Sequence, residues 1–375
     1  MKVLMVSCEG LGKGGVQSII MGIVEYLPNI DFDILLFTKE KRFYDSKFLN
    51  NGGEIFRIPS YDGNFSFFKK LDYYFRFLRI FLGVYKILKT NGPYSVIHCH
   101  NELESGICNI AAKLAGVKIR ISHAHTSYEK VTGRIYIFKK YKSLLRYITD
   151  KYSNIKIACS KDAYISTFGE KENFKKEDYI MGNFINLKKT FNNKVLEKEN
   201  NNFIVSHLGR YSVNKNQSLL LEIISKLQTK IPNIELRLIG YGNEYKDFLI
   251  KKSKKLNIES KVKFISGESK SNVFSELSNS DIFIFPSITE GFGISVLEAQ
   301  ALKIPCLVSN SLPKEVNCGL CKFISLDKNV EEWSKEALNI LTGNTKLKLE
   351  KQKILKYDIG NYINKILKIY RGEDL

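Results

Sequence analysis

The sequence lacks any continuous apolar run of about 18 residues, the length that a membrane-spanning helix requires. Its first residues, MKVLMVSCEG, also lack the charged segment and small-residue cleavage site of a secretory signal, and they predict a buried strand instead. Disulfides are not expected, because the seven cysteines are odd in number and scattered mainly through apolar runs. These absences indicate a cytoplasmic protein from a reducing compartment.

Acidic residues are scarce relative to basic ones, which gives a net charge of +19 that both halves of the chain share. Locally the excess is uneven: residues 65–89 hold six basic residues, one acidic residue and nine aromatic ones, and residues 130–151 form a second basic stretch. Such segments are attracted to anionic membrane surfaces, so we expect peripheral attachment to the inner face of the cell membrane. Two alternatives stay open: nucleic acid, which we do not expect as a partner, and lysine-rich faces that are merely solvated.

Helical spacing within residues 65–89 separates an apolar stripe from the remaining faces of a predicted helix. We predict that this stripe packs into the core. It consists of Leu71, Phe75, Leu78, Leu82 and Tyr85. Most of the basic residues and several aromatic ones then lie on other faces, together with Ile80.

Short apolar runs that indicate buried strands alternate with helical stretches along the chain. Those of the first half begin with KVLMVS and end with IKIACS, and the second half repeats the rhythm. This alternation predicts an α/β protein with two doubly wound, Rossmann-like domains, each built on a parallel sheet covered by helices. Because ligands bind at the carboxyl ends of such strands, we expect the two domains to face each other across a central cleft.

Composition sets the expected domain boundaries. Residues 186–202 are rich in asparagine and lysine without sustained periodicity, which indicates a linker. We therefore predict an N-terminal domain over residues 1–185 and a C-terminal domain over residues 186–352. Residues 353–375 contain a last helical pattern that we expect to pack back toward the N-terminal domain.

Two glutamates stand eight residues apart in the segment EGFGISVLE, which follows the apolar run DIFIF and leads into a helical pattern. Backbone N–H groups of residues 291–294, at the start of that helix, can bind an anion such as a diphosphate. Glu290 can accept a hydrogen bond from a sugar hydroxyl, and Glu298, one turn into the helix, can accept from the ribose. The pattern suits a nucleotide sugar; the alternative is a pair of solvated surface glutamates.

A pair of cations follows another predicted strand of the same half. The segment HLGRYSVNK turns at Gly209 and presents Arg210 and Lys215 before a helix. Arginine offers a planar fork for phosphate oxygens and lysine a mobile point charge, so together they can neutralise a diphosphate. Joined to the two glutamates, they complete a predicted site for a nucleotide diphosphate sugar.

These motifs resemble those of the retaining glycosyltransferases of the GT-B class, specifically glycosyltransferase family 4. The resemblance covers most of the chain, with EGFGISVLE, GRYSVNK and LIGYGNE in the second half and GKGGVQ and SHAHTSY in the first. It implies that Glu290 contacts hydroxyls of the donor sugar, Glu298 the ribose, and Arg210 with Lys215 the diphosphate.

The resemblance also assigns first-half residues. It implies that Gly14 and Gly15 let a loop approach the phosphate, and that His125 donates to the transferred sugar, although the neighbouring His123 is a second candidate for that place. The implied catalytic residues are Glu290, His125, Arg210 and Lys215. The implied donor-binding residues are Gly14, Gly15, Gly209, Arg210, Lys215, Gly240, Glu290, Gly291, Phe292, Gly293, Ile294 and Glu298.

The implied reaction is hexosyl transfer with retention from a nucleotide diphosphate sugar to a hydroxyl of a glycan or lipid-linked oligosaccharide, in bacterial capsule or exopolysaccharide synthesis. UDP is the expected nucleotide because it is the commonest donor nucleotide of the family. No side chain offers an obvious nucleophile, so we hypothesise that the leaving diphosphate itself takes the acceptor's proton. Neither a metal ion nor another cofactor is expected.

Two other enzyme classes compete with this interpretation. Residues 10–15 satisfy GxGxxG after a strand, as in NAD-dependent dehydrogenases, although the acidic residue expected near the second strand, Glu40, comes slightly late. A nucleotide-sugar epimerase of the same fold would bind the same donor and need no acceptor.

Two smaller features complete the candidates. The lone CxxC at residues 318–321 has no second half, so we assign no metal to it. His98 and His100 alternate with buried residues and are expected to be satisfied sheet histidines. His100 and Asn101 are nevertheless the candidates for acceptor binding.

Overall fold

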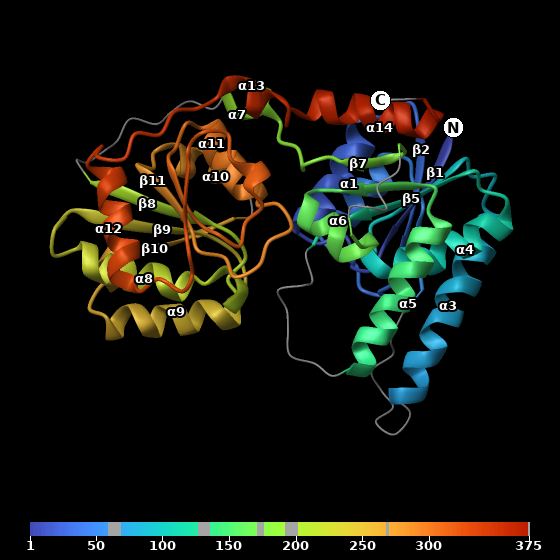
Figure 1. The fold of residues 1–375 in the computed structure, drawn as a ribbon, viewed down its shortest axis with the longest axis horizontal. Coiled ribbons are helices and arrows are strands. Elements are labelled where there is room, and N and C mark those ends of the chain that lie inside the picture. The colour runs from blue at the N-terminus through green and yellow to red at the C-terminus, as the bar shows by residue number, and fades with distance from the viewer. Residues whose placement is uncertain (59–68, 127–135, 171–175, 192–201, 268–269, 374–375) are drawn as a thin grey trace. The chain divides into compact units, whose positions relative to one another are not determined.

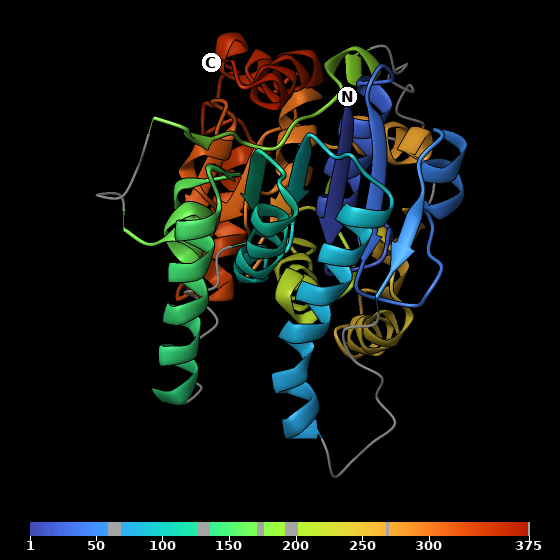
Figure 2. The ribbon, with the colours of Figure 1, turned by 90° about the vertical axis from the view of Figure 1, so that its right-hand side faces the viewer.

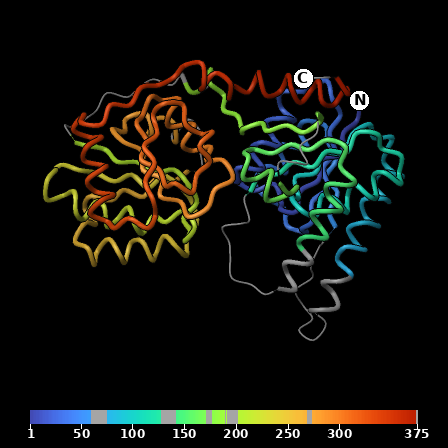
Figure 3. Tube along the Cα trace, in the orientation of Figure 1, coloured from blue at the N-terminus to red at the C-terminus, as the bar shows by residue number. Residues whose placement is uncertain are grey.

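The computed structural model describes residues 1–58, 69–126, 136–170, 176–191, 202–267 and 270–373 (Figures 1 and 3). They form two compact units, Met1–Asn183 with Ile359–Leu375, and Phe184–Asp358. The chain thus passes between units after Asn183 and after Asp358, close to the boundaries expected after residues 185 and 352. Residues 192–201 of the expected linker lie outside the described residues.

A seven-stranded parallel sheet in the order β3-β2-β1-β4-β5-β6-β7 forms the centre of the first unit. Its strands are β1 (Lys2–Ser7), β2 (Asp31–Leu36), β3 (Ile55–Arg57), β4 (Val96–Cys99), β5 (Ile119–Ala124), β6 (Ile155–Ala158) and β7 (Asp178–Ile180). The central strand β1 is buried on both faces from Val3 to Ser7, as a parallel sheet covered by helices requires.

Helices cover both faces of this sheet (Figure 1). They are α1 (Gly15–Tyr26), α2 (Asp45–Asn50), α3 (Lys69–Thr90), α4 (Ser105–Ala115), α5 (Tyr136–Tyr152), α6 (Lys161–Phe168) and α14 (Ile359–Arg371). On one face, Ile80 and Val84 of α3 join a core cluster with Leu4 and Ile97 of the sheet. On the other face, the C-terminal helix α14 contributes Tyr370, whose ring lies 6.3 Å from that of Phe32.

The second unit is built on a six-stranded parallel sheet in the order β10-β9-β8-β11-β12-β13. Its strands are β8 (Phe203–Leu208), β9 (Ile234–Gly240), β10 (Val262–Ser266), β11 (Ile282–Phe285), β12 (Cys306–Ser309) and β13 (Cys321–Ile324). Its helices are α7 (Leu187–Phe191), α8 (Gln217–Leu227), α9 (Asn243–Lys255), α10 (Lys270–Ser278), α11 (Ile294–Ala301), α12 (Val330–Leu341) and α13 (Lys351–Leu355). Trp333 of α12 is fully buried in its core cluster, which also contains Leu236 and Ile282.

Both sheets have the strand order of a doubly wound Rossmann-like fold, so the predicted α/β architecture is confirmed. In each sheet the winding direction reverses between two central neighbours: β1 and β4 in the first unit, β8 and β11 in the second. Such a switch point leaves a crevice at the carboxyl ends of the two strands, where ligands of this fold class bind. The loops that follow these four strands are therefore the places to look for a site.

The predicted core stripe of α3 is wrong at three of its residues, although its last member, Tyr85, does pack partly buried against the core. Phe75, Leu78 and Leu82 are 52, 51 and 53% exposed, whereas Ile80 and Val84, on the opposite side of the helix, are fully buried. Helical spacing identifies apolar faces but does not decide which one packs, and α3 has two of them. Residues 65–68 and the side chain of Leu71 lie outside what the structure describes. Among the described residues, no helix combines the length and apolar character needed to cross a membrane.

Candidate active site

The loop after β8 carries the predicted cations of the second unit. It passes through the short 3₁₀ helix Val213–Lys215 into α8. Gly240, at the end of β9, lies so close to this loop that a Cβ atom there would come within 2.1 Å of the Gly209 carbonyl oxygen. Gln217, the first residue of α8, donates from Nε2 to the carbonyl of Arg210 at 2.9 Å. The loop is thereby closed on itself, and Arg210 itself is exposed.

His207 lies beneath this loop and was not singled out by the sequence. Its Nδ1 is 3.0 Å from the carbonyl oxygen of Ile284 on β11, and its Nε2 is 3.3 Å from Nε2 of Gln217. Burial lowers the pKa of His207 to about 3, so the ring is neutral. It connects β8, β11 and the loop through Gln217.

Lys215 and Glu290 form a direct ion pair between Nζ and Oε1, although they are 75 residues apart. Each follows one of the two strands at the switch point, β8 and β11. Their side chains are 22 and 12% exposed, so the pair is mostly shielded but reachable. Ser287 Oγ donates to the same Glu290 oxygen at 2.7 Å, and Nζ lies 4.9 Å from the centroid of the Phe285 ring. The structure thus brings together a predicted cation and a predicted carboxylate.

A second set of hydrogen bonds fastens the two loops to each other. Asn214 Nδ2 donates to the carbonyl of Thr289 at 3.0 Å, and Thr289 Oγ1 donates to Asn214 Oδ1 at 2.7 Å. The backbone N–H of Ile288 donates to the carbonyl of Asn214 at 2.8 Å. These bonds hold in place the residues that directly precede Lys215 and Glu290 in the sequence.

The start of α11 lies immediately after Glu290 in the sequence. Gly293 precedes the helix with a φ of 93°, a conformation that favours glycine over other residues. Phe292 is buried, and its ring lies 5.4 Å from that of Tyr357. The first turn, from Ile294, therefore follows a tightly held loop, and Glu298 lies half-buried one turn further on. Backbone N–H groups at such a helix start favour an anion.

The glycine-rich loop of the first unit connects β1 to α1. Gly14 is the N-cap of α1 and Gly15 its first residue, with no acidic side chain in the first turn. A Cβ atom on Gly14 would come within 2.0 Å of Oε1 of Gln17, a buried side chain whose Nε2 donates to Glu9 at 3.1 Å. The side chain of Gln17 thus lies against the start of its own helix. The next strand at the switch point, β4, ends at Cys99, and His100 and Asn101 follow it directly.

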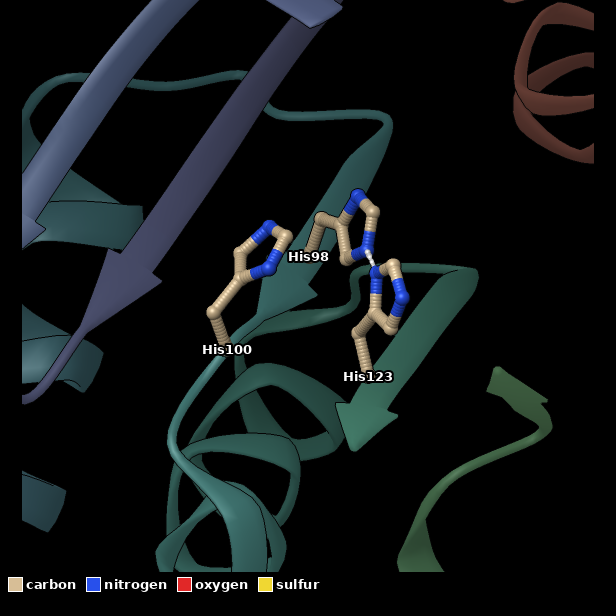
Figure 4. A group of neighbouring side chains, drawn as sticks. All are labelled: His98, His100 and His123. Atoms are coloured by element: carbon tan, nitrogen blue, oxygen red, sulfur yellow. Dashed lines mark hydrogen bonds between the residues drawn. The ribbon is translucent and has the colours of Figure 1, made fainter. Parts of the chain in front are cut away.

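Four of the five histidines of the chain lie together at this edge of the first sheet (Figure 4 shows three of them). His98 Nε2 is 3.2 Å from His123 Nδ1, and His100 Nδ1 is 2.8 Å from His125 Nε2. Burial lowers the pKa of His98 and of His125 to about 3, so these imidazoles are neutral. His125 is 6% exposed and His123 fully buried, so both candidates for the sugar contact belong to one cluster.

Two buried polar residues adjoin the cluster. Asn101, a candidate acceptor residue, has no hydrogen-bond partner for either side-chain atom among the described residues. Glu102, which sequence reasoning missed, has a φ of 51° and accepts from the backbone N–H of His125 at 2.9 Å and from Thr167 Oγ1 at 3.1 Å. Burial raises the pKa of Glu102 to about 7. A strained backbone and unsatisfied polar atoms are typical of functional sites.

Comparison with known protein families supports the glycosyltransferase interpretation of the sequence. Residues 188–358 match the family model "Glycosyl transferases group 1". These residues carry a group 1 glycosyl transferase domain. At the level that this domain match supports, the protein is a glycosyltransferase. Its similarity to solved structures shows the GT-B fold. The match covers nearly all of the second unit, which holds Lys215 and Glu290.

Two relatives cover almost the whole chain. The chain is 26% identical to the putative glycosyltransferase EpsF of Bacillus subtilis, over 96% of this chain and 94% of that protein. It is 24% identical to UDP-Gal:alpha-D-GlcNAc-diphosphoundecaprenol alpha-1,3-galactosyltransferase of Escherichia coli, over 95 and 93%. Among solved structures, Anabaena Alr3699/HepE in complex with UDP shares the fold with a TM-score of 0.76 at 16% identity, covering 99% of this chain and 100% of that one.

Proposed function

We propose that this glycosyltransferase is retaining and metal-independent, and that it moves a sugar from a UDP-sugar to a hydroxyl of a glycan or lipid-linked acceptor in bacterial surface polysaccharide synthesis. The observation that carries the proposal is the Lys215–Glu290 pair at the switch point of the second sheet. A nucleotide diphosphate sugar has an anionic diphosphate next to a hydroxyl-rich ring. A cation and a carboxylate side by side match that sequence of groups.

The ion pair sets the order of events on binding. Without substrate, Lys215 Nζ neutralises Glu290, and Ser287 holds the carboxylate in place. An arriving diphosphate competes for Nζ, so Glu290 regains an acceptor oxygen that a sugar hydroxyl can occupy. Arg210 and the backbone N–H groups at the start of α11 add positive charge for the phosphates. Glu298, one turn into α11, then takes the ribose hydroxyls.

The proposed chemistry uses the substrate's own leaving group. The acceptor oxygen bonds to the anomeric carbon as the bond from that carbon to the diphosphate oxygen breaks. The acceptor's proton passes to a diphosphate oxygen on the same face, which retains the configuration. Lys215 and Arg210 stabilise the charge that develops on the diphosphate, and this kind of stabilisation is usually the largest catalytic contribution. His125, with Gly14 and Gly15, is assigned to the sugar and phosphate from the first unit.

The donor and acceptor classes rest on the relatives. The Escherichia coli protein is named for UDP-Gal and for an acceptor on diphosphoundecaprenol, and the Anabaena structure contains UDP. The Bacillus subtilis relative is named putative glycosyltransferase EpsF. A Staphylococcus aureus relative is named capsular polysaccharide biosynthesis glycosyltransferase CapH. We therefore assign UDP as the nucleotide and a lipid-linked glycan as the acceptor.

Two helices of the first unit fit the anionic lipid surface on which such an acceptor would lie. The exposed Phe75, Leu78 and Leu82 share one face of α3, and the exposed Leu144 and Tyr147 share one face of α5. Helix α4 packs against both α3 and α5, and all three helices belong to the first unit (Figures 1 and 2).

Basic residues accompany both apolar faces. Lys86 and Lys89 are exposed on α3, and Lys151 is exposed on α5, each C-terminal to the apolar residues of its helix. Apolar side chains that enter the acyl boundary, with lysines that reach anionic headgroups, are the pattern of peripheral membrane binding. The two basic stretches expected from the sequence, residues 65–89 and 130–151, thus correspond largely to α3 and α5.

Substitution of the ion pair tests the proposal. Lys215→Ala and Glu290→Ala should each lower UDP release from UDP-sugars, with diphosphoundecaprenol-linked sugars as acceptors, by roughly 100-fold or more, since one lost donor to developing charge costs about 3 kcal/mol. Lys226→Ala is the matched control, because Lys226 pairs with Glu331 on the exposed surface of the same unit. Near-normal turnover by either site variant, with folding intact by circular dichroism, would contradict the assignment.

A further inference from the structure

The paired sequences His98-Cys99-His100 and His123-Ala124-His125 place four imidazoles on one face of two adjacent strands. Alternate residues of a strand point to the same face, and β4 and β5 are parallel neighbours, with His98 level with Ile121. Three of these residues, His98, His100 and His123, each offer one ring nitrogen such that the three nitrogens lie within 4.8 Å of one another (Figure 4).

We infer that His98, His100 and His123 form a binding site for a divalent transition-metal ion of the zinc class. In a tetrahedral zinc site the metal–nitrogen distance of about 2.05 Å puts two ligand nitrogens roughly 3.3 Å apart. His98 Nε2 and His123 Nδ1 are already 3.2 Å apart. Only the third nitrogen has to move inward, and three histidine ligands leave a fourth position open for water.

Hydrogen bonding prepares the cluster for this role. His98 Nδ1 is 2.8 Å from the hydroxyl of Tyr370 on α14, so it can carry its proton there and leave Nε2 unprotonated for a metal. Nε2 of His123 and of His100 have no hydrogen-bond partner among the described residues, although both side chains are more than nine-tenths buried. The proton that now lies between His98 and His123 can therefore move to His123 Nε2 when an ion takes its place.

The ligand chemistry selects the ion. Imidazole nitrogen suits zinc, copper, nickel and cobalt, whereas calcium and magnesium require oxygen ligands. A buried carboxylate is available to offset the charge, because Glu102 accepts from the backbone N–H of His125 at the same edge of the sheet. The proposed ligand His100 adjoins His125 at 2.8 Å, the residue that the proposed function assigns to the transferred sugar. The inference does not rest on that assignment, because ion binding is measured without sugar transfer.

Cobalt(II) titration of the full chain, first stripped with a chelator, tests the site. We expect visible d–d absorption typical of tetrahedral cobalt, saturation at one ion per chain, and displacement by zinc. His98→Gln and His123→Gln should abolish the absorption. His207→Gln is the matched control, since His207 is a buried histidine of the second unit outside the cluster, and it should leave the absorption unchanged.

Tyr370→Phe is the gentler variant, because it removes only the hydroxyl that orients His98. It should lower the affinity for cobalt by about 10-fold to 100-fold, as loss of an outer hydrogen bond typically does. Three results would overturn the inference: no cobalt absorption in the wild type, the same absorption in His98→Gln, or a thiolate-to-cobalt charge-transfer band that assigns the ion to cysteines. Because the readout is ion binding, none of them bears on sugar transfer.

Discussion

At the scale of single residues, Gly240 shows how the lack of a side chain shapes the donor loop. A Cβ atom at this position would meet the Gly209 carbonyl oxygen at 2.1 Å, and that oxygen is backbone, which cannot turn away as a flexible side chain can. Gly240→Ala should therefore push the loop with Arg210 and Lys215 outward. We expect a loss of about 3 kcal/mol in stability, at the upper end for overpacking, together with weakened nucleotide-sugar binding.

The matched control for this prediction is Gly12→Ala. A Cβ atom on Gly12 would have only ordinary contacts, the nearest at 3.7 Å to a side-chain carbon of Arg42. Urea midpoints of the two variants and the wild type give the comparison. Equal midpoints for Gly240→Ala and Gly12→Ala would contradict the prediction, because they would show that the loop can move outward with no loss of stability.

His207 predicts a pH dependence. Its pKa falls from 6.5 to about 3 on burial, so the folded protein keeps it neutral while the unfolded chain takes up a proton below pH 6.5. The stability that depends on a neutral His207 is present above pH 6.5 and is lost as the pH falls toward 3, by about 1.4 kcal/mol per pH unit. In His207→Gln the urea midpoint should fall less steeply between pH 7 and pH 5. Parallel slopes for variant and wild type would refute this.

The sequence could indicate Lys215 and Glu290 because both follow strands, and parallel strands deliver their carboxyl ends to one edge. It could not indicate that Ser287 bonds Glu290 or that Asn214 bonds Thr289, since those contacts depend on loop geometry that no spacing encodes. The roles assigned to Glu298 in ribose binding and to His125 in catalysis stay predictions.

At the scale of elements, α3 shows where periodicity stops being informative. The strand and helix alternation predicted all six strands of the second sheet and six of the seven strands of the first. It missed the short edge strand β7 (Asp178–Ile180), which follows the last predicted run, IKIACS. Helix α3 is apolar on two sides, and the choice between them depends on its packing against α4 and the sheet, which brings Ile80 and Val84 inward. The face left outside, with Phe75, Leu78 and Leu82, is the one that the proposed membrane contact would use.

The apolar faces of α3 and α5 predict a membrane-binding phenotype. Leu78→Gln combined with Leu144→Gln should reduce sedimentation with anionic liposomes by roughly tenfold or more, because burying one leucine side chain contributes about 1.5 kcal/mol or more. Leu114→Gln is the matched control, since Leu114 is 62% exposed on α4 of the same unit. No binding by the wild type even at low salt, or equal loss in all variants, would rule out a docking role for these faces.

At the scale of the whole molecule, the predicted site residues are distributed over both units. Lys215, Glu290 and Glu298 belong to the second, while Gly14 and His125 belong to the first. If the second unit holds the nucleotide, then UDP alone should bind, because the phosphate and ribose contacts are assigned to that unit. A dehydrogenase would instead bind NADH through the glycine loop of the first unit.

A thermal-shift panel separates these possibilities. UDP and UDP-sugars at a hundred times their dissociation constant should stabilise the wild type by about 2.7 kcal/mol, whereas GDP-sugars, ADP-sugars and NADH should shift it little. Lys215→Ala should lose the UDP shift because Nζ is proposed to contact the diphosphate, and His125→Ala should keep the shift while losing turnover. A shift with NADH alone would favour the dehydrogenase. Release of an epimerised UDP-sugar without acceptor would favour the epimerase, because both transfer and epimerisation begin with the same bound nucleotide.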